Sequence, residues 1–338
     1  MVATAVVRSA IVFILSTGAI LSQNASLSKL QSPSSNHVGQ LTRVGTVPVP
    51  SEVTNSFGRP LACDEDGNVY LASPNPSFEK IDIAGYFSVW DDNLYQLVFP
   101  HVLDRYVFSF KPDGSFKAAV KLSTGFPWIP GIIAVYPSGQ FLVSGLEYDK
   151  DATAAKWPIT GIFDADGSLL KEVRLEEDDT LHDMAAAGDT RVTTPGMSGV
   201  NHAISNGAVE VAGDGNAYLM RWTDPAIFYA ISAGGEVVRK FKLDAGEPGF
   251  MPSGMHVHKN RIAVLFLDPQ RGDHLIMKVV DLDGNVLATY EQRREDRSNA
   301  RQQLSAAFAC YLENPTRFVF AGADDDNRLQ LWLAEGRK

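Results

Sequence analysis

Few residues in this 338-residue chain have types and spacing that suggest chemistry. His256 and His258 lie two apart in a predicted strand, so both imidazoles face the same side and could bind Zn²⁺. The sequence places no third ligand beside them, and a structural pair is the alternative. Asp324–Asn327 offers oxygen ligands for Ca²⁺ but lacks the spacing of an EF-hand loop, so it also fits a polar connection.

Motifs for nucleophilic catalysis and for nucleotide binding are missing from the sequence. The segment 195–199 reads Pro-Gly-Met-Ser-Gly and lacks the glycine two residues before the serine that a nucleophile elbow requires. No Walker motif occurs, and no G-x-G-x-x-G follows a predicted strand. The catalytic residues, if there are any, stay unassigned.

Composition indicates an acidic globular protein, and the pattern of the first 22 residues indicates export. The formal charge of −10 argues against a nucleic-acid partner, which would require a basic patch. In residues 1–22, Arg8 precedes an apolar run over 10–21 that has the length of a signal-peptide core and is short for a membrane span. We predict a signal peptide over 1–22, with an uncleaved anchor as the alternative, and a flexible lead-in over 23–39. The mature chain is then periplasmic or secreted, with no membrane span.

Beyond residue 40 the sequence alternates between two kinds of predicted β-hairpin. Hairpins of the first kind have a tight polar turn between two apolar strands; they occupy 61–73, 86–99, 132–145, 207–222, 254–268 and 306–322. Hairpins of the second kind often carry Lys or Arg in their second strand, which suits an outer edge; they occupy 106–122, 160–175, 227–243 and 275–291.

One hairpin of each kind makes a four-stranded unit that repeats every 40–50 residues or so, which is the signature of a β-propeller. The last unit lacks an outer strand, and the segment 41–48 has no partner in the first. We therefore predict an all-β, six-bladed β-propeller over 40–338, closed by 41–48 pairing with 329–333. Two stacked β-sandwiches are the alternative, but they leave the unpaired strand unexplained.

The repeated turns resemble those of six-bladed β-propellers of the NHL/TolB-like type, especially exported bacterial members. The resemblance rests on Asp66-Gly67-Asn68-Val69-Tyr70-Leu71, Pro112-Asp113-Gly114, Asp214-Gly215-Asn216-Ala217-Tyr218-Leu219 and Asp283-Gly284-Asn285-Val286, and it covers about residues 40–335. These motifs specify turns and strands, so the resemblance implies a fold rather than an activity.

The two cysteines stand at equivalent positions of the first and last units. Cys63 and Cys310 both lie on first strands, and these units are neighbours only if the ring closes. In an oxidising compartment we predict a Cys63–Cys310 disulfide that fixes the closure. Two buried free thiols are an equally weighted alternative.

The irregular loops are predicted to share one face of the propeller, opposite the tight hairpin turns, and to carry any ligand site around a central funnel. Aromatic and cationic residues gather in these loops, as in pockets for small molecules or peptides. The ligand-binding candidates are His101, Arg105, Trp128, Trp157, Arg221, Trp222 and Arg271. The alternative is that the aromatic rings fill the funnel as a core.

Two functions remain open from the sequence. The first is a binding module for a protein, peptide or glycan partner, with no cofactor. The second is a metal-dependent hydrolase or lyase resembling gluconolactonase-like or amidating-lyase propellers. That resemblance implies a divalent metal on the axis, for which His256, His258 and acids such as Asp268 are weak candidates. The sequence shows no Glu/Asn/Asp set repeated at matching strand starts.

Overall fold

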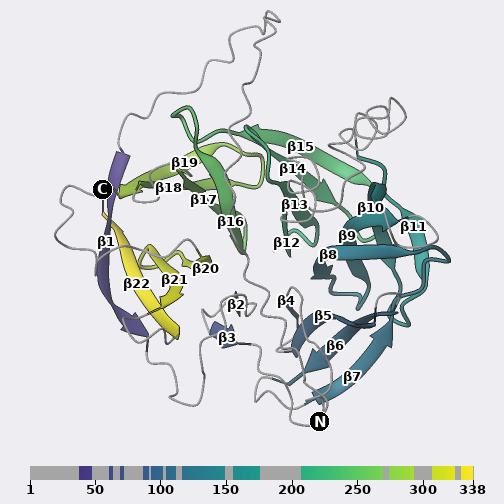
Figure 1. Ribbon diagram of the computed structural model, residues 1–338. Helices are drawn as coiled ribbons and strands as arrows, with labels where there is room; N and C mark the ends of the chain where they lie inside the picture. Colours follow the sequence, from purple (N-terminus) through teal and green to yellow (C-terminus); the bar gives the residue numbers. More distant parts are fainter. Residues whose placement is uncertain are drawn as a thin grey trace, which may run out of the picture. The chain divides into compact units, whose positions relative to one another are not determined.

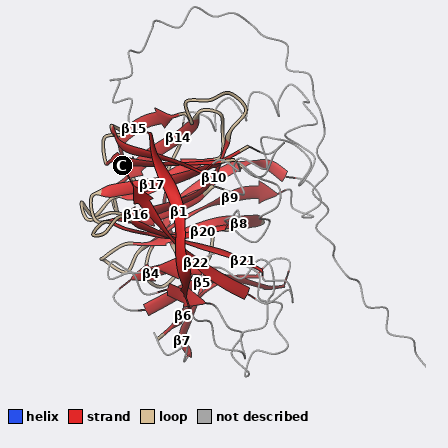
Figure 2. Ribbon diagram, turned by 90° about the vertical axis from the view of Figure 1, so that its left-hand side faces the viewer, coloured by secondary structure: helices blue, strands red, loops and turns tan. Residues whose placement is uncertain are grey.

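The computed structural model describes residues 38–47, 61–63, 69–71, 87–90, 93–101, 104–111, 116–148, 155–175, 207–268, 274–292, 307–323 and 329–337. All of them belong to the unit His37–Lys338. The regular elements within these ranges are β-strands, drawn red in Figure 2. The predicted signal peptide over 1–22 lies outside the described residues. The first strand starts at Val38, inside the predicted lead-in.

The described strands form successive antiparallel sheets (Figure 1). The first sheet is β2 (Leu61–Cys63) and β3 (Val69–Leu71). The second is β4 (Phe87–Trp90), β5 (Asn93–His101), β6 (Asp104–Phe110) and β7 (Phe116–Lys121). The third is β8 (Trp128–Val135), β9 (Phe141–Tyr148), β10 (Ala155–Phe163) and β11 (Leu169–Glu172). The fourth is β12 (Ala208–Val211), β13 (Ala217–Arg221), β14 (Ala226–Ile231) and β15 (Val237–Leu243).

The remaining strands form one larger sheet. Its first half is β16 (Met251–His258), β17 (Arg261–Leu267), β18 (Leu275–Asp281) and β19 (Val286–Gln292). Its second half is β20 (Ala307–Leu312), β21 (Arg317–Ala323) and β22 (Leu329–Arg337), joined to the first half by β1 (Val38–Val47). Every predicted hairpin of both kinds has its two strands paired antiparallel.

The first strands of these groups contact one another in a closed circuit. β2 contacts β4, then β8, β12, β16 and β20 follow in order, and β20 contacts β2 again. An all-β fold whose four-stranded units follow one another around a circuit fits a β-propeller, as predicted. Two stacked sandwiches would not give this cyclic order.

Closure by the N-terminal strand is confirmed. In β1, Gly45, Thr46 and Val47 oppose Leu333, Trp332 and Leu331 of β22 in antiparallel register. One feature of this strand was not predicted: Val38–Gln40 pair in parallel with Thr289–Glu291 of β19. The N-terminal strand therefore completes the last unit and also joins it to the preceding one.

Hydrophobic cores fill the space between adjacent sheets. In one cluster, Tyr218 and Phe228 from the fourth sheet pack with Val264 and Val280 from the next. Another cluster brings Leu41 of β1 together with residues of β17–β19 and of β20–β22. The fourth sheet contributes to a core on each of its faces, so its central strand β14 is apolar on both faces and every residue of it is buried.

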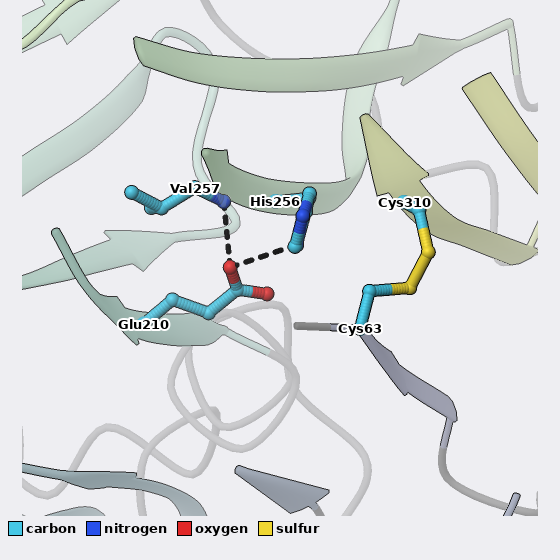
Figure 3. The surroundings of a disulfide bond; sticks show 5 residues. All are labelled: Cys63, Glu210, His256, Val257 and Cys310. Atoms are coloured by element: carbon cyan, nitrogen blue, oxygen red, sulfur yellow. Dashed lines mark hydrogen bonds and ion pairs between the residues drawn. A yellow bond between two sulfur atoms is a disulfide. The ribbon is translucent and has the colours of Figure 1, made fainter. Parts of the chain in front are cut away.

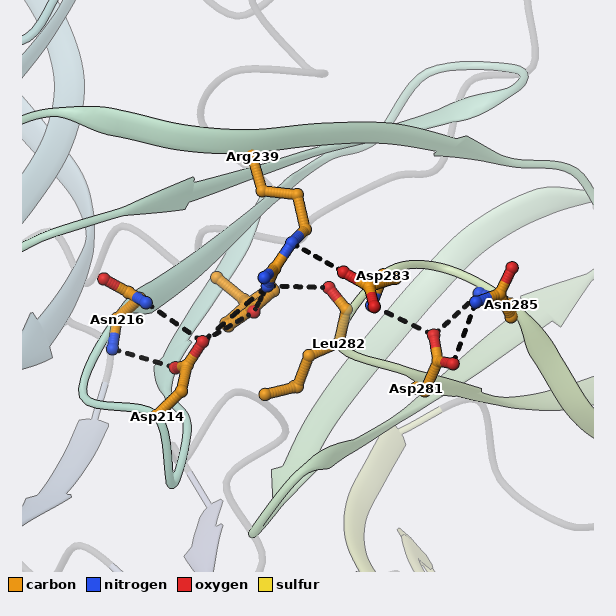
Figure 4. A network of polar contacts seen from close by, with 8 residues as sticks. Asp214, Asn216, Arg239, Asp281, Leu282, Asp283 and Asn285 are labelled. Atoms are coloured by element: carbon orange, nitrogen blue, oxygen red, sulfur yellow. Dashed lines mark hydrogen bonds and ion pairs between the residues drawn. The ribbon is translucent and has the colours of Figure 1, made fainter.

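The tight turns are stabilised by aspartate side chains and tied to one another across sheets. Asp214 accepts hydrogen bonds from the backbone N–H and side-chain amide of Asn216, an Asx turn. Arg239 of β15 reaches the next unit, where its Nε lies 2.8 Å from Asp283 Oδ1 and its Nη1 donates to the Leu282 carbonyl at 3.1 Å (Figure 4). The Asp-Gly motifs are thus accounted for by turn and inter-sheet structure.

Glycine is required at one of these turns for two reasons. Gly284 has a φ of 86°, in the left-handed region. A Cβ there would also lie 2.5 Å from the ring of Phe241 on β15. The turn after β18 can approach the neighbouring sheet only because this residue has no side chain.

Candidate functional site

The first strands of the units, which form the circuit described above, are called the inner strands. Those of the first and last units are joined covalently. Cys63 of β2 and Cys310 of β20 form a disulfide bond, with Cα atoms 5.8 Å apart and a sequence separation of 247 residues. Neither cysteine is free in the structure. The bond lies where the circuit of inner strands closes, at the opposite edge of the last unit from β1.

A carboxylate and an imidazole meet beside this bond (Figure 3). The backbone N–H of Val257 donates to Glu210 Oε2 at 2.6 Å, and the same oxygen lies 3.0 Å from His256 Nδ1. Glu210 comes from the inner strand β12 and keeps 33% of its side chain exposed, whereas the His256 side chain is 3% exposed. Both ring nitrogens of His256 are buried and have no hydrogen-bond partner among the described residues, so the imidazole lies close to the carboxylate without a hydrogen bond between them. The pair therefore presents a positioned carboxylate at the inner strands.

The weak metal candidates from the sequence do not form one ligand set. His256 and His258 do share a face of β16, and their rings lie edge-on to Phe308 and Tyr311 of β20. However, His258 opposes Arg261 while Asp268 follows the far end of β17. Seven residues of extended strand separate these ends by roughly 20 Å. Strand register thus excludes Asp268 from a site with His258.

Two predicted ligand-binding cations make contacts between sheets. Arg105 of β6 is buried, and its Nε donates to the carbonyl of Trp128 on β8 at 3.0 Å. Arg221 of β13 is also buried, and its Nη1 donates to Ser144 Oγ at 3.0 Å. Its Nη2 lies 3.4 Å from Thr160 Oγ1, and the two hydroxyls are 2.8 Å apart. These guanidinium groups connect neighbouring sheets.

The predicted aromatic ligands are placed as core where their side chains are described. Trp128 is 5% exposed and stacks on Phe163 with ring centroids 5.3 Å apart. Trp222 packs partly buried against the core between the fourth sheet and the next. Trp157 and His101 lie in β10 and β5. Their side chains, and the whole of Arg271, lie outside the described residues. The core alternative therefore holds for Trp128.

A second cluster of donor atoms was missed by sequence reasoning. Ligand atoms of Glu247, His274 and Glu291 all lie within 4.8 Å of one another. Glu247 lies in the connection from β15 to β16, His274 just before β18, and Glu291 near the end of β19. The strand pairing would have indicated two of these residues. Glu291 opposes Ile276, and His274, two positions before Ile276, lies on the same face of the sheet. The contribution of Glu247 had no such signal.

Comparisons with known proteins identify no family for this chain. No protein-family profile matches it, and no curated protein does. Similar solved structures include a catalytically inactive virginiamycin B lyase from Staphylococcus aureus with quinupristin, at 9% identity and a TM-score of 0.43, covering 88% of this chain and 99% of that one. A putative TolB from Agrobacterium tumefaciens has 11% identity and a TM-score of 0.39, covering 83% and 90%. An endo-arabinanase from Bacillus licheniformis has 12% identity and a TM-score of 0.35, covering 74% and 92%. These likenesses identify no function for this chain.

Among the residues that the structure describes, no helix has the length and hydropathy needed to cross a bilayer.

Proposed function

We propose that this protein is an exported six-bladed β-propeller of the NHL/TolB-like type that binds a peptide or protein partner through its inner strands and loop face. The circuit of first strands, from β2 through β4, β8, β12 and β16 to β20, supports six blades. The pattern of residues 1–22 supports export, and a disulfide between Cys63 and Cys310 suits an oxidising compartment.

Glu210 carries the binding function. Its carboxylate lies on an inner strand, is partly exposed and is oriented by the backbone N–H of Val257, with His256 beside it. A preoriented carboxylate suits an ammonium or guanidinium group, because charge-assisted hydrogen bonds are the stronger ones. The formal charge of −10 would also draw a cationic ligand toward the protein. A peptide with Lys or Arg side chains is therefore favoured over a neutral glycan.

The test uses the exported chain and a peptide array. Peptides containing Lys or Arg are compared with the same peptides carrying Gln at those positions, and hits are titrated by fluorescence anisotropy. We expect the cationic members to bind, and Glu210→Gln to weaken binding by about tenfold or more, which is about 1.4 kcal/mol. Glu172→Gln, on the exposed outer strand β11, removes the same charge and should have no effect. Absence of peptide binding, or equal loss in both variants, would overturn the proposal.

A metal-dependent hydrolase or lyase is the second candidate, favoured by the contact between His256 and Glu210 at the inner strands. Among the described residues, the three side chains that could hold a metal lie away from this contact: Glu247 before β16, His274 just before β18 and Glu291 in β19. This candidate predicts metal-dependent turnover of a lactone by the purified chain, abolished by Glu210→Gln. Turnover of that kind would replace the binding function.

A further inference from the structure

We propose that Glu247, His274 and Glu291 form a divalent-metal site on the loop face, separate from the Glu210 carboxylate. The cluster brings together one imidazole and two carboxylates, whose ligand atoms lie within 4.8 Å of one another. An imidazole with carboxylates suits Zn²⁺ and similar first-row ions better than Ca²⁺, which takes oxygen ligands. Glu247 and His274 come from two connections and Glu291 from the strand β19, so the chain brings them together only when folded.

Two of the donors are held in place by the fold. His274 is 9% exposed, and its ring lies edge-on to Phe250, with centroids 4.7 Å apart. His274 Nε2 contacts Glu291 Oε1 directly. Glu291 lies in the paired part of β19, opposite Ile276 on one side and Gln40 of β1 on the other. These contacts hold the imidazole and one carboxylate side by side, and an ion would replace the direct contact between them.

Glu247 is the adjustable donor. It lies in an exposed connection between Gly246 and Gly249, both of which have φ values in the left-handed region, near 87°. Donors on one tetrahedral Zn²⁺ at bond lengths of about 2.1 Å lie about 3.4 Å apart, so binding requires a movement of up to about 1.4 Å by Glu247 and opening of the direct contact between His274 and Glu291. An exposed glutamate side chain can make such a shift by rotation. Three protein donors also leave a coordination position open to water or to a ligand group.

Lys278 places a positive charge beside the connection that carries Glu247. Lys278 Nζ lies 3.9 Å from Asp244 in the same connection. Burial lowers the pKa of Lys278, and Asp244 offsets part of that effect. Lys278 thus supplies one positive charge beside Asp244, and an ion at Glu247, His274 and Glu291 would supply the charge that neutralises the two glutamates.

The experiment measures metal binding directly. Untagged protein is stripped with a chelator and titrated with Zn²⁺ by calorimetry and with Co²⁺ by visible absorption, which reports imidazole and carboxylate coordination. We expect one ion per chain. Glu247→Gln and Glu291→Gln should each weaken binding at least about tenfold, and Zn²⁺ should raise the melting temperature of the unaltered protein but not of these two variants. Glu247 is exposed, so Glu247→Gln is expected to fold, which circular dichroism checks.

Glu236→Gln is the matched control, because it removes an exposed carboxylate that pairs with Lys171 in another sheet. It should bind the ion as the unaltered protein does. Absence of saturable binding below about 1 mM would overturn the proposal, since even a weak site of this kind would be detected there. Equal affinity in all three variants would also overturn it, because the ion would then bind elsewhere. Neither result depends on whether Glu210 binds a peptide.

Discussion

Breaking the bond between Cys63 and Cys310 should destabilise this protein about as much as truncating a large buried side chain. The bond closes a loop of 247 residues, so it removes much of the conformational freedom of the unfolded chain. The chain-entropy treatment gives about 5.5 kcal/mol at 25 °C for a loop of this length, while measured bridges contribute about 2–5 kcal/mol. We therefore expect a loss of roughly 2–5 kcal/mol in the free energy of unfolding.

Urea denaturation with and without reductant measures this loss. With an m-value of about 3 kcal/mol/M, the expected loss moves the midpoint down by roughly 1–2 M. Alkylation and mass analysis of the same samples establish that both thiols are free after reduction. The double variant Cys63→Ala/Cys310→Ala is the control, because its midpoint should already be low and should not respond to reductant.

The reasoning fails if the reduced protein, with two titrated thiols, keeps the midpoint of the oxidised protein within about 0.3 M, a change of about 1 kcal/mol. It also fails if peptide mapping of the oxidised protein finds two free cysteines. The first result would mean that the unfolded chain gains little freedom, and the second that the closure is held by packing and strand pairing alone.

Three further predictions concern stability. Leu41→Ala should lower the free energy of unfolding by about 2–5 kcal/mol, because Leu41 is buried in the core that β1 completes. Val44→Ala, on the exposed side of β1, should lower it by less than about 0.5 kcal/mol, and the midpoints of urea denaturation of the two variants measure the difference. Arg221→Met should lower stability by about 2 kcal/mol, because charge-assisted bonds to Ser144 and its neighbour are lost, with no change in peptide affinity. Burial raises the pKa of Asp281, but hydrogen bonds from its turn outweigh this and lower it overall, so its contribution is present above the unfolded pKa and is lost as pH falls through the folded one. Asp281→Asn should therefore destabilise by less than about 1 kcal/mol at pH 7 and have a smaller effect near pH 3, as acid titrations of the two proteins will show.

The hairpins were predictable because their signals are local. A turn such as Asp281–Asn285 fixes the register of the strands on either side within a few residues, and Asp side chains bond their own turn. The closing strand was predictable for a different reason: the last unit lacked a strand and 41–48 lacked a partner. Both inferences need only strand pattern and the requirement that an edge be paired.

Contacts between sheets could not be predicted in the same way. Arg221 meets Ser144 across 77 residues of sequence, and the partners depend on how two twisted sheets stack. Arg221 is predicted to bind a ligand because aromatic and cationic residues gather in the irregular loops. Its burial against two hydroxyls follows from sheet packing, which no pattern in its own strand encodes.

The strand β1 lies beside both the C-terminal strand β22 and the proposed metal ligand Glu291 on β19. Gln40 of β1 opposes both Arg337 of β22 and Glu291 of β19, so the residue that begins the closure lies beside a proposed ligand. An ion bound by Glu291 would restrain the end of β19, and with it the short parallel pairing that joins the last unit to the preceding one. The disulfide acts on the inner edge of the last unit, and β1 acts on its outer edge. Removing the ion should therefore loosen the outer connection first and leave the inner one in place.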